Sequence, residues 1–124
     1  MQVVPYPLDL ADCQRLSGSD PFGFPRESFV ILTAFDFMSS VERKNPMATL
    51  KAFTECSRCL PHLHLVVKTV NHRSFPDADR KLREALSVLP SGRYTIVDKT
   101  LSRKGMFALL NSSDAFISLH RAEG

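Results

Sequence analysis

The sequence has no apolar run near the roughly 20 residues that a membrane helix needs, and no basic segment followed by an apolar one at its start. It has only 3 cysteines among 124 residues. An odd, small number of cysteines argues against a disulfide framework and fits a reducing compartment. These absences predict a cytoplasmic domain without a membrane span.

Charge of one sign is also scarce. The 16 Lys and Arg residues exceed the 13 Asp and Glu residues by a net charge of +3, which falls short of the dense basic face of a nucleic-acid binder. Neither Gly-x-Gly-x-x-Gly nor Gly-x-x-x-x-Gly-Lys-Ser/Thr occurs, so NAD binding and P-loop chemistry are unsupported. The length and the 44% apolar content are those of one globular domain.

What the sequence does contain is a buried-strand pattern that leads into a helix start. Residues 29–35 form a continuous apolar run rich in β-branched and aromatic residues, which is typical of a strand buried on both faces. After a polar loop, Asn45 is expected to cap a helix that begins at Pro46. Arg43 and Lys44 would then lie beside a helix N-terminus, where a phosphate binds favourably.

The rest of the chain alternates helix and strand patterns. Helices are expected over 45–60, 77–89 and 103–111, and strands over 62–70, 93–97 and 114–119. This alternation predicts an α/β, Rossmann-like parallel sheet of about four strands in the order 3-2-1-4, with helices on both faces. Residues 1–28, rich in Pro and Gly, are expected to be a lead-in loop with a possible short strand.

Two cysteines and two histidines lie within nine residues, at Cys56, Cys59, His62 and His64. These are zinc-binding residue types, but Cys56 falls on the expected buried face of its helix and Pro61 separates the two pairs. A redox Cys-x-x-Cys needs its first thiol at a helix N-terminus, whereas this pair lies at a C-terminal end. We expect no metal site and a core position for Cys56.

Ligands of open parallel sheets bind beyond the carboxyl ends of the strands. Most cations outside the helices fall in the segments that follow the four expected strands, which predicts an anionic ligand there. Ser39 and Ser40 are either hydroxyl donors to that anion or simple loop residues. Glu123, close to His120 and Arg121 after the fourth strand, is a candidate to bind sugar hydroxyls or to orient a cation.

Two motifs, in order, resemble the group 1 glycosyltransferases of GT-B architecture. Residues 39–46 match Ser-x-x-Glu-Arg-Lys-Asn-Pro, and residues 118–124 match Ser-Leu-His-Arg-x-Glu-Gly. Residues 3–9 are similar to the Val-x-Pro-Asn-Pro-Val-Asp lead-in of the same domain. The likeness covers essentially the whole chain and corresponds to the first half of the C-terminal, nucleotide-sugar-binding domain.

The resemblance implies roles for three charged residues. Lys44, together with Arg43, matches the basic residue that holds the donor diphosphate. Glu123 matches the first of two glutamates spaced eight apart, near the donor sugar, and is the expected catalytic residue. The usual Gly-Arg after the first strand is replaced by Phe35-Asp36, so that arginine's role is either unfilled or taken by Arg43.

Four further residues are expected near the donor nucleotide or sugar: Lys68, Asp98, Leu101 and His120. Residues 98–101, which include Asp98 and Leu101, fall where a loop of the family contacts the base of the donor nucleotide. The donor is a substrate, and no cofactor or metal is implied.

On this resemblance, residues 29–124 form part of a nucleotide-sugar-binding domain cut from a longer chain. The parent would be a hexosyltransferase of polysaccharide biosynthesis. It would move a sugar from a nucleotide-sugar to a glycan or lipid-linked acceptor held by a missing N-terminal domain. The 124 residues alone are expected to turn nothing over and to be capable of self-association. The alternative is a non-catalytic, flavodoxin-like nucleotide- or phosphate-binding or regulatory module.

Overall fold

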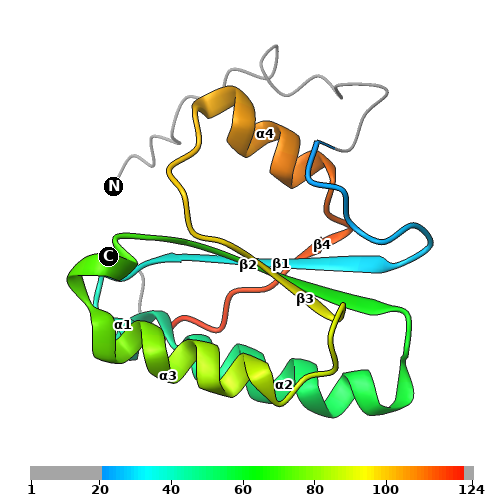
Figure 1. The fold of residues 1–124 in the computed structure, drawn as a ribbon, viewed down its shortest axis with the longest axis horizontal. Coiled ribbons are helices and arrows are strands. Elements are labelled where there is room, and N and C mark those ends of the chain that lie inside the picture. The colour runs from blue at the N-terminus through cyan, green and yellow to red at the C-terminus, as the bar shows by residue number, and fades with distance from the viewer. Residues whose placement is uncertain (1–20, 122–124) are drawn as a thin grey trace, which may run out of the picture.

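The computed structural model describes residues 21–121. Its four strands form one parallel sheet in the order β3-β2-β1-β4 (Figure 1), which confirms the predicted Rossmann-like α/β fold. The elements are, in chain order, β1 (Phe29–Asp36), α1 (Val41–Lys44), α2 (Pro46–Cys59), β2 (Leu63–Val70), the 3-10 helix η2 (His72–Ser74), α3 (Pro76–Ser87), β3 (Tyr94–Val97), α4 (Arg103–Asn111) and β4 (Ala115–Phe116).

Helices cover both faces of the sheet, as predicted. In Figure 1, α2 and α3 lie along one face and α4 lies along the other. Each face has its own apolar core: one includes Leu50, Phe53 and Leu86, and the other includes Leu32 and Leu109. This two-sided arrangement follows from parallel strands joined by right-handed helical crossovers.

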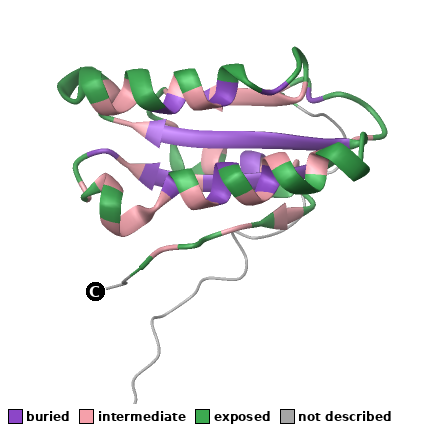
Figure 2. Ribbon diagram, turned by 90° about the horizontal axis from the view of Figure 1, so that it is seen from below, coloured by how far each residue is buried: buried purple, intermediate pink, exposed green. Residues whose placement is uncertain are grey.

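β2 is the most protected element of the fold. All of its residues except the last are buried, and it runs as a continuous buried strand through the molecule in Figure 2. It pairs with β1 over Phe29–Asp36 on one side and with β3 on the other. A strand flanked on both edges and covered on both faces is mostly apolar, and most of its buried polar groups are hydrogen-bonded.

The helical periodicity predicts some buried faces correctly and others not. In α3, Leu82 and Leu86 are buried, as the amphipathic pattern indicates. In α2, Leu50 is buried but Cys56 is exposed, so the expected core position of Cys56 is wrong. A three-residue spacing drifts around a helix of 3.6 residues per turn, and by Cys56 it has moved off the sheet-facing side.

β4 is shorter than the expected strand over 114–119. Only Ala115 and Phe116 pair with β1, opposite Ile31 and Leu32. The chain then leaves the sheet and bonds to the connection between β1 and α2, as described below.

The lead-in is described from residue 21 onward, and the possible short strand at 2–4 lies outside the described residues. Phe24 is buried and packs on the same face of the sheet as α4. Within residues 21–121, no helix is both long and apolar enough to span a bilayer.

His64, on β2, is only 3% exposed. Its Nδ1 lies 2.9 Å from the Gly92 carbonyl oxygen, and its Nε2 lies 2.8 Å from Thr95 Oγ1. A carbonyl only accepts, so Nδ1 carries the proton and Nε2 accepts from the hydroxyl. Burial is the largest cause of a lowered pKa for His64, and the charge of Arg93 lowers it further, while the bond to Gly92 opposes both.

This lowered pKa predicts a loss of stability in mild acid. Below pH 6.5, the ordinary pKa of histidine, the unfolded chain takes up a proton that the folded chain does not. The free energy of unfolding should therefore fall as the pH drops from 6.5 to the folded-state pKa, by at most about 1.4 kcal/mol per pH unit. Urea unfolding at a series of pH values checks this.

His64→Gln should show a shallower slope over the same pH range, and an equal slope would refute the assignment. The variant is needed because His120 also has a lowered pKa. The lowered pKa values of Asp36 and Asp98 change the free energy of unfolding only near and below pH 3.8, the ordinary pKa of an aspartate.

Candidate functional site

The connection between β1 and α2 begins with a turn organised by Asp36. Its Oδ1 accepts a hydrogen bond from the Met38 backbone N–H at 2.9 Å and from Asn71 Nδ2 at 2.8 Å. The bond from Asn71 and then the bond from Met38 lower the pKa of Asp36. The carboxylate therefore joins the loops after β1 and β2 rather than projecting alone at the strand end.

The sequence pattern predicts a loop up to Lys44, but the structure forms one helical turn there, α1. Ser40 is its N-cap, and the Ser40 hydroxyl accepts from the Arg43 N–H at 3.4 Å. Ser40 thus caps α1 in this structure. Ser39 lies in the preceding turn, where its N–H donates to the Asp36 carbonyl at 2.9 Å.

Asn45 joins α1 to α2 in a left-handed conformation, with φ 52° and ψ 47°. Its backbone N–H closes α1 by donating to Val41 O at 2.8 Å. The expectation that Asn45 caps α2 is only half right: Pro46 does begin the helix, but Asn45 makes no side-chain cap bond. Its amide instead donates to the Leu119 carbonyl at 3.0 Å.

The segment after β4 is held against this junction by further contacts. The Arg121 N–H donates to Arg43 O at 2.8 Å, and Lys44 Nζ lies 3.5 Å from His120 Nδ1. Figure 1 shows this orange-red segment running from β4 towards α1. Arg43, Lys44 and His120, which are 77 positions apart at the extremes, therefore meet at the carboxyl edge of the sheet.

The cations of this cluster affect one another. Burial first, and then the charges of Lys44 and Arg43, lower the pKa of His120. A neutral His120 accepts from the Lys44 ammonium through Nδ1 and carries its proton on Nε2. An anion placed beside these side chains would be attracted by Lys44 and Arg43 and would raise the pKa of His120 again.

The N-terminus of α2 adds a further source of positive potential. The side chain of Asn45 makes no hydrogen bond to the backbone at the start of α2, and the first turn of α2 holds no acidic residue. The first backbone N–H groups of a helix have no partner within it and carry a partial positive charge. Since α2 runs over Pro46–Cys59, this end belongs to a helix of 14 residues and is separated from Lys44 by Asn45 alone.

Three more predicted site residues lie at the ends of β2 and β3. Lys68 is buried in β2. Asp98 follows β3, and its Oδ2 accepts from Arg83 at 2.7 Å, with His72 Nε2 at 3.9 Å. The bond from Arg83 is the largest cause of the lowered pKa of Asp98. Leu101 packs against the core on the α4 side.

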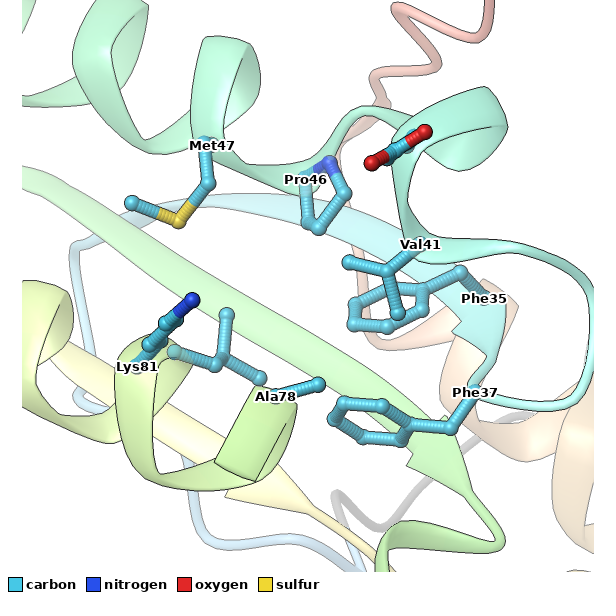
Figure 3. A pocket seen from close by; sticks show the side chains of 9 residues that line it. Phe35, Phe37, Val41, Pro46, Met47, Ala78 and Lys81 are labelled. Carbon is cyan, nitrogen blue, oxygen red and sulfur yellow. The ribbon is translucent and has the colours of Figure 1, made fainter. Parts of the chain in front are cut away.

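An apolar pocket of about 250 Å³ lies between α1, the start of α2 and the start of α3. Figure 3 shows Phe35 and Phe37 lining it from β1 and the adjoining turn, with Met47 and Lys81 reaching in from the helices. Its only charged lining residues are Glu42 and Lys81. Arg43, Lys44 and His120 are not among its lining residues, and a mostly apolar lining does not suit a diphosphate.

The structure thus brings Arg43, Lys44 and His120 together. It leaves Lys68, Asp98 and Leu101 in a second group at the neighbouring strand ends, and Glu123 lies outside the described residues. Within residues 21–121 no group of three or more His, Cys, Asp or Glu side chains could hold a metal ion.

Sequence reasoning missed two contacts that shape these groups: the Asn45 bond to Leu119 and the Arg83 bond to Asp98. Asn tolerates left-handed backbone better than most residues, which was the available signal at Asn45. For Arg83, on an amphipathic helix, the sequence offers no such signal.

The chain matches no protein-family model and no curated protein sequence. The structure itself shows a small parallel α/β domain with sheet order 3-2-1-4.

The role of Asn45 can be tested by two substitutions. Asn45→Gly retains the left-handed conformation and loses the amide bond to Leu119, so the free energy of unfolding should fall by about 0.5–1.5 kcal/mol. Asn45→Ala also has to adopt a left-handed conformation, which costs about 1–2 kcal/mol more.

Urea unfolding measures both changes. Asn111→Ala, at the exposed end of α4, is the control and should change stability by less than about 0.5 kcal/mol. Equal stabilities for Asn45→Ala and Asn45→Gly would contradict the backbone argument.

Proposed function

We propose that this chain is the donor-binding portion of a glycosyltransferase. The enzyme would transfer a hexose from a nucleotide-sugar to a glycan or lipid-linked acceptor, in the cytoplasmic stage of polysaccharide biosynthesis. The proposal joins the family resemblance of residues 39–46 and 118–124 to the geometry of the described residues.

The contact between Lys44 and His120 is the observation that carries the proposal. The two family-like motifs lie far apart in the sequence, yet their residues meet at 3.5 Å at the edge of the sheet where ligands bind. A shared site for one ligand requires such a meeting. Adjacent strands β1 and β4 bring the motifs to the same edge, and the bond from Arg121 to Arg43 holds them there.

The chemistry follows from the charges of the cluster. As the bond between sugar and diphosphate breaks, negative charge develops on the leaving diphosphate. Lys44, Arg43 and the N-terminus of α2 would stabilise that charge without rearranging, because the fold already holds them in place. Lys44 would act as a point charge and Arg43 as a fork of donors.

Glu123 completes the proposal on the sugar side. It comes two residues after Arg121, which is bonded to the carbonyl of Arg43. A carboxylate close to the donor sugar would accept hydrogen bonds from its hydroxyls and stabilise positive charge that develops on the sugar ring. This role comes from the resemblance.

The alternative is a non-catalytic, flavodoxin-like nucleotide- or phosphate-binding or regulatory module. An acidic pocket at the strand ends would favour the version of it that resembles a response regulator. Asp36 is the acid at the end of β1, and its carboxylate bonds to Met38 and Asn71. The basic cluster of Arg43, Lys44 and His120, at the same edge of the sheet, favours an anionic ligand instead.

Lys44→Ala provides the test. Isothermal titration of the full chain with nucleoside diphosphates and their sugars should show an affinity about ten- to a hundredfold lower in the variant. That range corresponds to the loss of one charge-assisted contact of about 1.5–3 kcal/mol. In the unchanged protein, NMR titration should show the pKa of His120 rising when the diphosphate is added.

Lys51→Ala is the matched control, because Lys51 is an exposed lysine seven positions further along the chain, in the neighbouring helix α2. Its removal should change affinity less than about twofold, as expected for a screened surface charge. Equal affinities for Lys44→Ala and the unchanged chain would remove the phosphate assignment.

A further inference from the structure

Lys68 is a charged residue inside the sheet. It lies on β2 between Ala34 of β1 and Val97 of β3, and it is 5% exposed. Its Nζ donates to the Thr69 carbonyl at 2.9 Å and to the Lys99 carbonyl at 2.8 Å. The ammonium therefore donates hydrogen bonds to two backbone carbonyl oxygens at the carboxyl edge of the sheet.

Stability alone does not account for a lysine at this position. Moving an ammonium out of water is costly, and a well-packed apolar residue of similar size often gives equal or greater stability. Burial lowers the pKa of Lys68, and the charges of Asp98 and then Asp36 oppose that shift. The charges of Asp98 and Asp36 therefore partly compensate the buried ammonium. Its bond to the Lys99 carbonyl links β2 to the segment that follows β3.

The segment that Lys68 holds is the connection between β3 and α4, residues 98–102. Asp98 is bonded to Arg83 of α3, and Ser102 caps α4 through the Gly105 N–H at 3.1 Å. Between these two points, the Lys68 ammonium holds the carbonyl of Lys99. Without it, the main chain of the connection would lose its bond to the central strand.

We propose that Lys68 is a positioning residue that fixes residues 98–102 at the mouth of the sheet, where they contact the nucleoside part of the donor. This inference rests on the proposed function. At 5% exposure, Lys68 reaches the donor only through the loop it holds. The basic cluster at Arg43 and Lys44 binds the diphosphate separately, beside β1 and β4.

Lys68→Met in the full chain tests this, because Met fills a similar volume but has no group that can donate a hydrogen bond. Affinity for a nucleoside diphosphate should fall about tenfold, because binding would then have to order a loop that has lost its hydrogen bond to the Lys68 ammonium. Affinity for inorganic pyrophosphate should stay within about twofold. Hydrogen exchange of the backbone amides at 99–102 should become faster, while amides of β2 keep their protection.

The two ligands separate the possible outcomes. Equal losses for both ligands, or no loss for either, would overturn the inference, as would unchanged exchange at 99–102. Failure of the unchanged chain to bind either ligand would instead overturn the proposed function and, with it, the donor role of the loop.

Lys68→Gln provides a second measurement if the Met variant does not fold. Its amide is a donor on a side chain one bond shorter, so it should show the same direction of change in the ratio of the two affinities. An unchanged ratio in a folded Gln variant also counts against the inference.

Discussion

The carboxyl edge of this domain depends on the contact between the segment after β4 and the junction of α1 and α2. Asn45 provides the critical geometry, since its left-handed backbone ends one helix, begins the next and aims its amide at Leu119. The bond from Arg121 to Arg43 then holds the segment along the junction. β4 ends at Phe116, and the segment that follows makes these bonds to the junction.

The same contact determines the electrostatics of the edge. It gathers Arg43, Lys44 and His120, and burial together with the charges of Lys44 and Arg43 lowers the pKa of His120. Like charges brought together repel, and a bound anion removes that repulsion. At the ends of β1 and β3 the carboxylates of Asp36 and Asp98 are bonded to Asn71 and Arg83, so these acids have partners apart from the basic cluster beside β4.

Much of the fold could be predicted because it follows from local pattern. The apolar runs of β1 and β2 indicate buried strands, and the stripe of α3 indicates its sheet-facing side. The errors fall where local pattern is weak: α1 is a single turn, and Cys56 lies where a three-residue spacing has moved off the sheet-facing side of α2. The burial of Lys68 could not be predicted, because it depends on neighbours far along the chain. A cation in a strand does not reveal which carbonyls will receive it.

By itself, then, the sequence determined the alternation of strands and helices, the sheet order and the positions of the basic residues along the chain. These depend on apolar periodicity and on the handedness of crossovers, which act over short stretches. Tertiary structure alone decided that Lys44 meets His120, that Asn45 reaches Leu119 and that Lys68 holds the carbonyl of Lys99. Each contact joins residues more than thirty positions apart, and only the packed sheet brings such partners within hydrogen-bonding distance.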